Sequence, residues 1–446
     1  MFSKILIANR GEIAVRIIRA CKEMGILTVA VFSEADKDAF HVSLADESYC
    51  IGPAAVSESY LNMGAILTVA VNAKAEAIHP GYGLLSENPE FAQLCEECGI
   101  IFIGPDSGVI TLMGNKDEAR RTVKNAGISV IPGADLITNT EEAVEEAEKL
   151  GYPVMLKARS GGGGRGIRVV QNADEIITAY NTAGLEAAKA FGDGGMYMEK
   201  YLYPVKHIEV QLLCDNYGNC ICLGDRDCSI QRKNQKILEE CPALIPENIR
   251  KNMHKDAIKI AGSVNYKGAG TIEFLMDKDN YYFMEMNTRL QVEHSVTEMA
   301  TGIDIVKWQI RVAADYKINF AEPDLINTHA IECRINAEDP LRNFKPNCGE
   351  VTLLHIPGGH NVRFDTALYQ NYFIPPYYDS MIGKLIVGAK TREEAVRKMR
   401  GALSELVIEG IYHNSELQIE ILSDEEFNTG DYTTDFLNKK GYVNSK

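Results

Sequence analysis

The chain has 446 residues, a length typical of about three domains. Its 46% apolar and 24% charged residues exclude general disorder and collagen-like or coiled-coil architectures. The net charge of −16 argues against bulk nucleic-acid binding, and no apolar run approaches the ~20 residues of a membrane helix. The first residues lack the pattern of a signal peptide. We therefore expect a cytoplasmic localisation, with neither nucleic acid nor a membrane as a partner.

The eleven cysteines, an odd number in a chain of this length, do not indicate a disulfide framework. Cys95 and Cys98 form a CxxC inside a helical pattern, without a second pair at the distance of a zinc site. Four thiolates could hold zinc in a second group, but its spacing fits no common zinc module: Cys214, Cys220, Cys222 and Cys228. We expect buried or half-buried free thiols at both places.

The first hundred residues alternate between strands and helices. Apolar patterns predict strands at 4–8, 26–32 and 100–103, and a helix at 11–24 that Gly25 closes. The turn after the first strand reads Asn-Arg-Gly-Glu-Ile-Ala (9–14), without the glycine series that brings a dinucleotide pyrophosphate onto a helix. We predict a Rossmann-like domain that holds no dinucleotide.

The pattern of predicted helices and strands changes in the central region. A capping box at 138–141 predicts an acidic helix that ends at Gly151, and a strand follows at 152–157. Strands dominate from about 205 to 294, a helix is expected at about 298–315, and mixed α+β sequence runs to the end.

Residues 161–166 read Gly-Gly-Gly-Gly-Arg-Gly and formally match G-x-G-x-x-G. The β-branched segment from Ile167 excludes a Rossmann loop, and the residues of Walker and kinase loops are missing. The pattern indicates a β-hairpin tip whose backbone amides can lie over phosphates. Four cations and no acid occur from Lys157 to Arg168, which favours an anion ligand over a plain flexible hairpin.

The most informative pattern lies at 271–294, where we expect a strand at 271–276, a turn at 277–280 and a long strand at 281–294. Five polar residues of the second strand alternate with apolar ones and would share one face: Glu285, Asn287, Arg289, Gln291 and Glu293. At ~3.3 Å per residue, Glu293 would lie roughly 13 Å along the strand from Glu285, too far to bind the same ion.

A three-residue hairpin loop would place Glu273 directly opposite Glu285. Two opposed buried carboxylates repel each other, so they need a cation or a shared proton. With Asn287 they form a set of oxygen donors that suits Mg²⁺. We favour a metal site over a solvated polar sheet face, which more typically carries Lys, Thr and Ser.

Several ordered stretches then carry a family resemblance: 7–14, 79–88, 157–166, 226–229 (Arg-Asp-Cys-Ser), 285–294 (Glu-Met-Asn-Thr-Arg-Leu-Gln-Val-Glu-His), 332–338 (Glu-Cys-Arg-Ile-Asn-Ala-Glu) and 378–381 (Tyr-Asp-Ser-Met). With them the chain resembles the ATP-grasp superfamily, and within it the biotin carboxylases, over essentially its whole length. The resemblance implies an α/β and α+β protein in three parts. These are a Rossmann-like domain at 1–114, an ATP-grasp domain at 115–314 with a mobile glycine-loop lid at about 131–203, and a mixed α+β domain at 315–446.

The resemblance also implies roles for single residues. ATP would be bound by Lys116, Lys157, Gly163, Gly164, Glu199, Lys200, Tyr201, Leu202, His207, Gln231, Asn234, Glu273 and Glu285. Mg²⁺ or Mn²⁺ would be held by Glu273, Glu285 and Asn287, and bicarbonate by Lys236, Arg289 and Val292. Arg289, Glu293 and Lys236 would be catalytic, with Glu293 as the base, and Arg334 and Tyr82 would bind biotin.

The implied activity is the ATP-dependent carboxylation of carrier-bound biotin by bicarbonate through carboxyphosphate, the first half-reaction of acetyl-CoA carboxylase in fatty acid biosynthesis. Since no biotinyl-lysine motif precedes Lys446, we expect one subunit of a larger carboxylase, with a biotin carboxyl carrier protein, carboxyltransferase subunits and a second copy of itself as partners. The alternatives are a subunit of a pyruvate or other acyl-CoA carboxylase, a different ATP-grasp ligase, and a nucleotide-binding regulatory subunit. The intact polar residues at 236, 285, 289 and 293 speak against the last.

The sequence departs from the family pattern at a few positions. Asn234 stands where the family usually has a histidine, and Arg159 replaces a small residue beside the glycine loop. Ser295 replaces a usual proline, and Asn347-Cys348 stands where Ser-Pro is common. None of these changes removes a predicted metal, bicarbonate or base residue.

Overall fold

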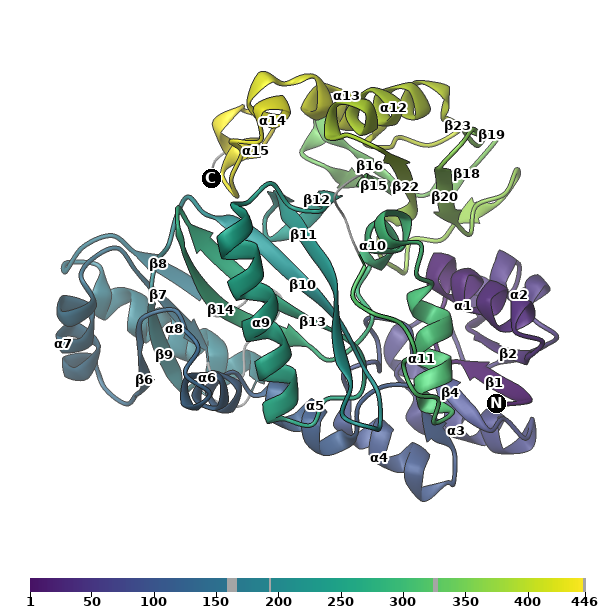
Figure 1. Cartoon of the computed structure of the whole chain (residues 1–446), viewed down its shortest axis with the longest axis horizontal. Coiled ribbons are helices and arrows are strands. Elements are labelled where there is room, and N and C mark those ends of the chain that lie inside the picture. The colour runs from purple at the N-terminus through teal and green to yellow at the C-terminus, as the bar shows by residue number, and fades with distance from the viewer. Residues whose placement is uncertain (159–166, 192–193, 324–327, 444–446) are drawn as a thin grey trace.

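The computed structural model describes residues 1–158, 167–191, 194–323 and 328–443. Its N-terminal part is a five-stranded parallel sheet in the order β3-β2-β1-β4-β5, with helices on both faces (Figure 1). Its elements are β1 (Lys4–Ile7), α1 (Gly11–Glu23), β2 (Leu27–Phe32), α2 (Phe40–Leu44), β3 (Glu47–Cys50), α3 (Met63–Asn72), β4 (Ala77–His79), α4 (Pro89–Glu97), β5 (Ile101–Phe102) and α5 (Ser107–Gly114). The predicted Rossmann-like order is confirmed.

The order of this sheet reverses between β1 and β4, where related sheets bind ligands. Here the loops that follow β1 and β4 are bonded to each other, because the Asn9 side chain donates to the carbonyls of Pro80 at 2.7 Å and Tyr82 at 2.8 Å. Gly81 lies at φ +66°, and a Cβ there would come within 2.9 Å of the Asn9 amide nitrogen. Asn9 and Gly81 therefore lock the loop that carries Tyr82.

An eight-stranded antiparallel sheet forms the centre, in the order β14-β13-β10-β11-β12-β15-β22-β20 (Figure 1). Its strands are β10 (Lys206–Cys214), β11 (Cys220–Arg232), β12 (Gln235–Cys241), β13 (Gly268–Asp277), β14 (Asn280–Asn287), β15 (His329–Asn336), β20 (Val362–Thr366) and β22 (Met381–Ala389). Since β12 pairs with β15, one sheet runs through the boundary predicted at 314/315. The domain boundaries themselves stay predictions.

A separate four-stranded sheet, β6-β9-β7-β8, carries two helices and forms the predicted lid region. Its elements are β6 (Gly133–Ile137), α7 (Thr140–Leu150), β7 (Val154–Ala158), β8 (Ile167–Val170), α8 (Ile176–Phe191) and β9 (Met196–Lys200), and α6 (Lys116–Asn125) precedes them. Strands β7 and β8 pair antiparallel with Lys157 opposite Ile167, which confirms the hairpin flanks. The glycine loop, with Arg159, Gly163 and Gly164, lies outside the described residues. The cap of α7 is Asn139, one residue later than predicted, because its side chain accepts the Glu142 amide.

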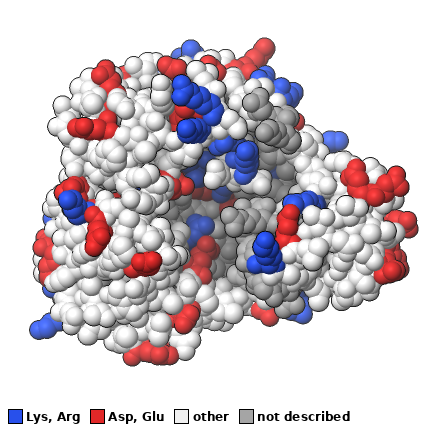
Figure 2. Space-filling view, turned by 180° about the vertical axis from the view of Figure 1, so that it is seen from behind, with Lys and Arg blue, Asp and Glu red and all other residues white. Residues whose placement is uncertain are grey.

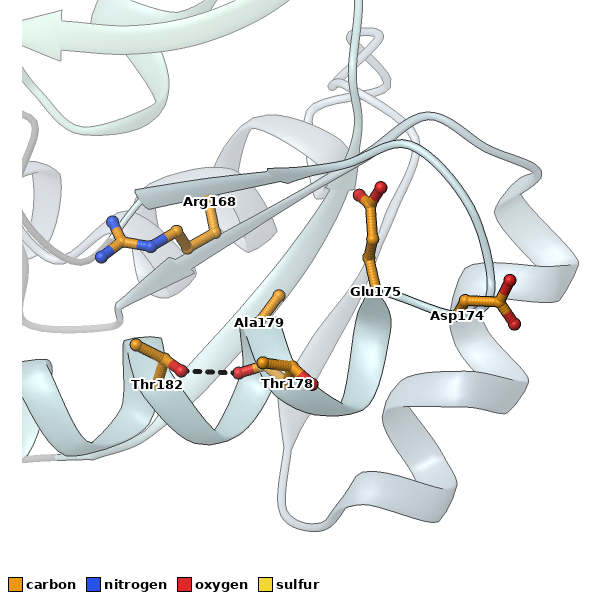
Figure 3. Close-up of a pocket in the computed structure, with 6 residues that line it drawn as sticks. All are labelled: Arg168, Asp174, Glu175, Thr178, Ala179 and Thr182. Carbon is orange, nitrogen blue, oxygen red and sulfur yellow. Dashed lines mark hydrogen bonds between the residues drawn. The ribbon is translucent and has the colours of Figure 1, made fainter. Parts of the chain in front are cut away.

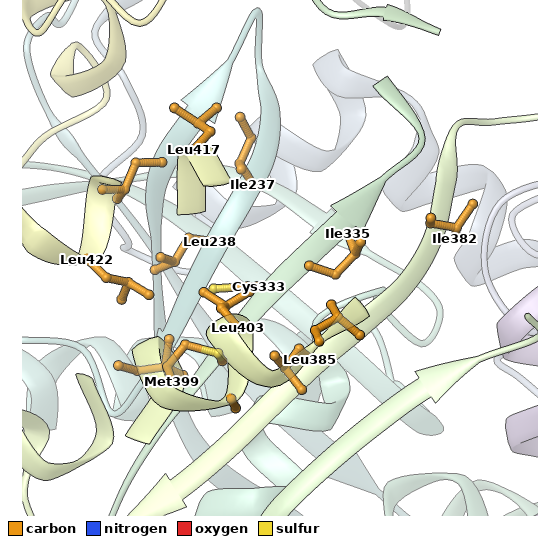
Figure 4. Close-up of a cluster of buried hydrophobic side chains, with 14 of the residues drawn as sticks. Ile237, Leu238, Cys333, Ile335, Ile382, Leu385, Met399, Leu403, Leu417 and Leu422 are labelled. Carbon is orange, nitrogen blue, oxygen red and sulfur yellow. The ribbon is translucent and has the colours of Figure 1, made fainter. Parts of the chain in front are cut away.

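The C-terminal strands β12, β15 and β22 are covered on one face by α12 (Arg392–Glu405) and α13 (Ser415–Ser423). Leu238, Cys333, Leu385, Met399 and Leu403 meet there in a buried cluster (Figure 4). The remaining short elements are β16 (Glu338–Asp339), β17 (Lys345–Pro346), β18 (Gly349–Glu350), β19 (Leu353–His355), β21 (Phe373–Ile374), β23 (Val407–Glu409), α14 (Glu425–Thr429) and α15 (Phe436–Lys439). The other face of the same strands packs against α10 and α1 and carries part of the candidate site.

Two sequence expectations about elements were wrong, and one helix was missed. Strands dominate at 205–294 as expected, but the stretch also contains α9 (Glu247–Ser263), whose apolar residues Ile249, Met253 and Ile260 pack on the sheet. The helix expected at 298–315 is two helices, α10 (His294–Thr301) and α11 (Ile305–Ala313), because Gly302 turns left-handed at φ +71° and Asp304 caps the second. The long strand expected at 281–294 ends at Asn287.

The expectation of free thiols also needs a correction. Cys214 and Cys220 are directly opposed at the end of the β10–β11 hairpin, and the structure joins them in a disulfide. Cys95, Cys222 and Cys228 carry buried free thiols, as expected, whereas the free thiol of Cys98 is exposed. No helix in the described part of the chain is long and apolar enough to cross a membrane.

We predict that Leu385→Ala lowers the free energy of unfolding by about 2–5 kcal/mol, because it leaves a cavity in the cluster of Figure 4. Chemical denaturation of the purified variant measures the change. Leu341→Ala is the matched control, since Leu341 is 97% exposed and its loss should change stability by less than about 0.5 kcal/mol. Equal effects of the two changes would contradict this placement of the core.

Candidate functional site

The candidate site lies on the face of the central sheet that α9 does not cover. Along β10, the apolar Ile208 and Val210 pack toward α9, so that the alternating His207 and Glu209 point to the opposite face. Seen from behind, the molecule is hollowed in its middle, and Lys and Arg side chains gather at the margin of the hollow (Figure 2).

The predicted carboxylate pair is present, for a partly different reason. Glu273 of β13 is directly opposite Glu285 of β14. The hairpin turn has two residues, and with it alone Glu273 would face Met284. A bulge at Met284 shifts the register by one residue and turns Glu285 toward Glu273. Asn287 completes the group, since its amide donates to Glu273 at 2.8 Å.

His207 and Glu209 add two further donor groups to this pair. His207 contacts Glu273 at 2.7 Å, and the possible ligand atoms of His207, Glu209 and Glu273 all lie within 4.8 Å of one another. Sequence reasoning assigned His207 to ATP and missed Glu209. The signal for Glu209 was the alternation of polar and apolar residues at 207–212, in a strand that is otherwise apolar.

Lys236 of β12 connects the carboxylates. Its ammonium contacts Glu209 and donates to Glu273 at 3.0 Å and to Glu293 at 2.7 Å. Burial alone would lower the pKa of Lys236, but Glu209, Glu273 and Glu293 outweigh it and raise that pKa well above its usual value. Lys236 is therefore a permanent cation at the centre of the site.

The pKa values of the carboxylates follow from the same charges. Burial would raise the pKa of Glu273, but Lys236 and His207 outweigh it and lower this pKa well below its usual range. Burial and the neighbouring Glu273 raise the pKa of Glu285. The pKa of Glu293 is lowered, because Lys236 and Arg334 overcome the effect of burial. Glu293 is therefore ionised at neutral pH.

The segment after β14 reaches the site as a turn. Because the strand ends at Asn287, the idea that Arg289, Gln291 and Glu293 share one strand face with Glu285 was wrong. The turn still directs Gln291 to Glu273, at 2.7 Å. Arg289 donates to Glu87 at 2.8 Å and to the side-chain oxygen of Asn287 at 2.9 Å, and Glu87 is a further residue that sequence reasoning missed.

Glu293 lies between Lys236 and a second cation, Arg334 of β15. Arg334 donates to Glu293 at 3.0 Å and to the buried Glu239 at 2.6 Å. Glu239 is directly opposite another buried acid, Glu332. Burial raises the pKa of Glu239 to about 7 and that of Glu332 well above its usual range, so this pair holds a proton at neutral pH.

The N-terminal part contributes Tyr82, whose hydroxyl donates to Glu12 of α1. Glu12 in turn lies 3.2 Å from Lys384 of β22, and Lys384 donates to the Val292 carbonyl at 2.7 Å. Tyr82 is thus connected through two buried charges to the turn before Glu293.

The residues predicted for the nucleotide form a second group beside the lid. Lys157 of β7 is paired with Glu199 of β9, and Lys116 is close enough to act on the pKa of Glu285. The Gln231 amide lies 2.9 Å from His207, which connects this group to the metal pair. Tyr201 and Leu202 follow β9 as half-buried residues at the lid boundary.

Two of the predicted nucleotide residues have other partners. Lys200 donates to the carbonyls of Gly151 and Tyr152, at 2.8 and 3.1 Å, and so points into the loop between α7 and β7. Asn234 is exposed in the two-residue turn between β11 and β12, where it and Lys233 both have positive φ. Asn is well suited to that backbone, which gives a local reason for its presence.

Arg226 of β11 is fully buried and connects several polar residues of the site. It donates to Glu209 at 3.0 Å, to Gln211 at 2.8 Å and to Thr297 at 3.0 Å, and it also contacts Gln291. It thereby fixes both β10 and the turn before α10. The motif at 226–229 carried part of the resemblance, but it gave no sign of this role.

The donor set fits a hard cation. Glu273 and Glu285 are directly opposite each other, and the Asn287 side-chain oxygen, which accepts from Arg289, lies beside them. Burial and the charge of Glu273 raise the pKa of Glu285, so a cation bound here would stabilise its ionised form. A shallow pocket between β8 and α8 has no comparable set, because its Arg168 is engaged by Glu186 and its acids, Asp174 and Glu175, lie at the helix start (Figure 3).

Comparisons with known proteins agree with this geometry. Family models match the chain in three blocks: "Biotin carboxylase, N-terminal domain" at 1–110, "Carbamoyl-phosphate synthase L chain, ATP binding domain" at 115–321, and "Biotin carboxylase C-terminal domain" at 332–439. Biotin carboxylase 1 of Bacillus subtilis is 54% identical over 442 residues, 98% of either chain. The chain belongs to the biotin carboxylase family. It is an ATP-dependent ligase with an ATP-grasp domain.

Other members of the family belong to different carboxylases. A pyruvate carboxylase subunit of Methanothermobacter thermautotrophicus is 50% identical over 98% of this chain and 90% of its own. A crystal structure shows the dimeric biotin carboxylase domain of the Hydrogenobacter thermophilus 2-oxoglutarate carboxylase in complex with MgADP, ADP and bicarbonate. It matches with a TM-score of 0.95 and 49% identity over the full length of both chains.

Arg226→Met should lower the free energy of unfolding by about 3–5 kcal/mol, because it leaves the buried Glu209 with one cation fewer. The double change Glu209→Gln/Arg226→Met should cost less than the sum of the single changes, since no unpaired charge remains. Denaturant unfolding of the four proteins measures the coupling. Lys251→Met, at a side chain 73% exposed, is the control that should leave stability unchanged. Additive effects would show that Arg226 and Glu209 do not interact as described.

Proposed function

We propose that the protein carboxylates biotin attached to a separate carrier protein, with ATP, Mg²⁺ and bicarbonate as the other reactants. The observation that carries this proposal is one unbroken series of contacts. Glu273 contacts Lys236, Lys236 contacts Glu293, and Glu293 contacts Arg334. These contacts support the proposal, because they connect the residues that would bind the metal, bicarbonate and biotin, in a chain of the biotin carboxylase family.

The metal group would be Glu273, Glu285 and Asn287. When bound there, Mg²⁺ would offset the charge on the phosphoryl oxygens of ATP. Lys116, Lys157, His207 and Gln231 approach the same space from the lid side and would hold the nucleotide. The hinge at 199–202 would contact the adenine. Mn²⁺ would serve by the same oxygen ligands.

Bicarbonate would lie between the metal group and Glu293, held by Lys236 and Arg289. Val292 has an apolar side chain, so its contribution would come from the backbone N–H, which has no acceptor within the described part of the chain. A bicarbonate oxygen attacks the terminal phosphorus of ATP, ADP leaves with the bridging electron pair, and Glu293 takes the bicarbonate proton. The product is carboxyphosphate.

Biotin would enter beside Arg334 and Tyr82. Glu293 releases the bicarbonate proton to solvent, and carboxyphosphate breaks down to CO₂ and phosphate. The phosphate takes the ureido proton and passes it to the ionised Glu293, while the ureido nitrogen bonds to the carbon of CO₂ and gives carboxybiotin. Arg334, together with Arg289, would stabilise the negative oxygen that develops on the ureido ring. A closing lid would exclude water from the labile intermediate.

The finer biological setting rests on the relatives. We propose that the protein is a homodimeric, cytoplasmic subunit that works with a biotin carboxyl carrier protein and carboxyltransferase subunits. The acceptor would be acetyl-CoA, in fatty acid biosynthesis, in keeping with the identity to a Bacillus subtilis biotin carboxylase. The relatives from pyruvate and 2-oxoglutarate carboxylases keep a second acceptor class open, since the acceptor is chosen by the transferase subunit.

The purified protein should cleave MgATP slowly, and bicarbonate together with free biotin should accelerate the cleavage. A coupled ADP assay measures the rate, with each additive omitted in turn and with EDTA as the metal control. Cleavage that is indifferent to bicarbonate and biotin would reject this function in favour of another ATP-grasp ligase.

Glu293→Gln should retain the fold and MgATP binding and lower kcat for biotin carboxylation by ~10²-fold or more, because the base is lost. The amide keeps the shape of the side chain beside Lys236 and Arg334. Glu425→Gln, at an exposed helix start, is the matched control. Steady-state kinetics decide the point. A kcat near that of the wild type, with only KM for bicarbonate raised, would leave Glu293 as a partner of the two cations and no more.

A further inference from the structure

Lys384 of β22 bonds to the backbone of the turn before Glu293. Within the part of the chain that the structure describes, it is the one side chain of β12, β15, β20 and β22 that does so. Its side chain is fully buried, and its ammonium donates to the Val292 carbonyl at 2.7 Å. Sequence reasoning gave Lys384 no role, and the proposed mechanism does not use it.

The surroundings of Lys384 keep it charged. Burial alone would lower its pKa, but the acids around it outweigh burial and raise that pKa. The groups that face it come from several neighbouring elements: Glu12 of α1 at 3.2 Å, His294 of α10, Glu332 and Arg334 of β15, Arg363 and Asp365 of β20, and Tyr82 of the N-terminal loop. An ammonium is costly to bury, so its position here needs the acids that accompany it.

The bond to Val292 acts on a turn that is also held on either side. Gln291 is held by Glu273 and Arg226, and Glu293 is held by Lys236 and Arg334. Lys384 supplies the contact in between, to the peptide that joins residues 292 and 293. Three consecutive residues are thus each fixed by side chains from other strands. The middle contact sets the direction of the Val292 backbone and of the bond to Glu293.

We propose that Lys384 is a positioning residue for bicarbonate, which fixes the Val292–Glu293 peptide so that the Val292 N–H and the Glu293 carboxylate meet the same substrate. This proposal rests on the proposed function of the site. Misplacement of reacting groups by about 1 Å can cost ~10²-fold in rate, so a lost anchor should be visible in the bicarbonate kinetics. The competing view is that Lys384 is only an ion partner of Glu12 that holds the N-terminal part against the sheet.

The test compares Lys384→Met, Glu12→Gln and the double change Glu12→Gln/Lys384→Met. The double change removes both members of the ion pair, so that a folded protein is expected even if the single Met variant is unstable. Lys398→Met is the matched control. Lys398, a half-buried residue of α12, also donates to a backbone carbonyl at the end of β22, that of Gly388 at 2.6 Å, and to the His360 carbonyl at 3.3 Å.

The double variant should lose at least ~10-fold in kcat/KM for bicarbonate. Its Kd for MgATP, measured by calorimetry, should stay within about twofold of the wild-type value, and its melting temperature within a few degrees. Glu12→Gln keeps the Val292 bond and should lose less than threefold, and Lys398→Met should match the wild type. A double variant with wild-type bicarbonate kinetics would overturn the proposal. So would a Glu12→Gln variant that loses as much as the double variant, because the ion pair alone would then explain the effect. Wild-type ATP cleavage that ignores bicarbonate would instead reject the proposed function.

Discussion

The burial of opposite charges on one face of the central sheet is the constraint on which the rest of the structure depends. Lys236 is buried among Glu209, Glu273 and Glu293, and none of these groups could remain in the interior without the others. The apolar side of the same strands is conventional, packed by α9 and α12. The fold therefore gains its stability from the apolar face of the sheet, and the other face carries a buried cluster in which cations separate the acids.

This arrangement explains why the site spans the whole molecule. Helix α6, which precedes the lid region, packs on β14, and the charged face of β12, β15 and β22 meets the turn before α10 and the N-terminal helix α1. Glu12 lies more than 300 residues before Arg334 and Lys384 in the sequence, yet each of the three is within a few contacts of Glu293. The proposed reaction has two successive steps and would use this reach, because ATP and biotin would enter the site from different sides.

The sequence predicted the fold class, the hairpin flanks of the glycine loop and the opposition of Glu273 and Glu285, since these follow from local patterns and from the family resemblance. The reasoning behind that opposition was partly wrong, because a bulge at Met284 and not the loop length sets the register. Strand patterns do not reveal bulges, which arise from how a strand must twist against its neighbours. Gly302 ends α10 in a left-handed conformation, a signal for the helix break that the sequence analysis did not use.

Four of the residues that sequence reasoning missed have one property in common. Glu209, Arg226, Glu239 and Lys384 are charged residues inside buried strands, and each is buried by parts of the chain far away in sequence. Apolar neighbours mark Glu209 and Lys384, but Arg226 and Glu239 stand next to acids. Only the sheet order and the elements packed on the sheet show which charges each residue meets. Glu239 is opposite Glu332 and bonded to Arg334, and Lys384 is opposite Arg334 and paired with Glu12 of α1. A charged residue of a buried strand is therefore best interpreted as a member of a charged cluster, whose other members lie on neighbouring strands and on the helices packed against them.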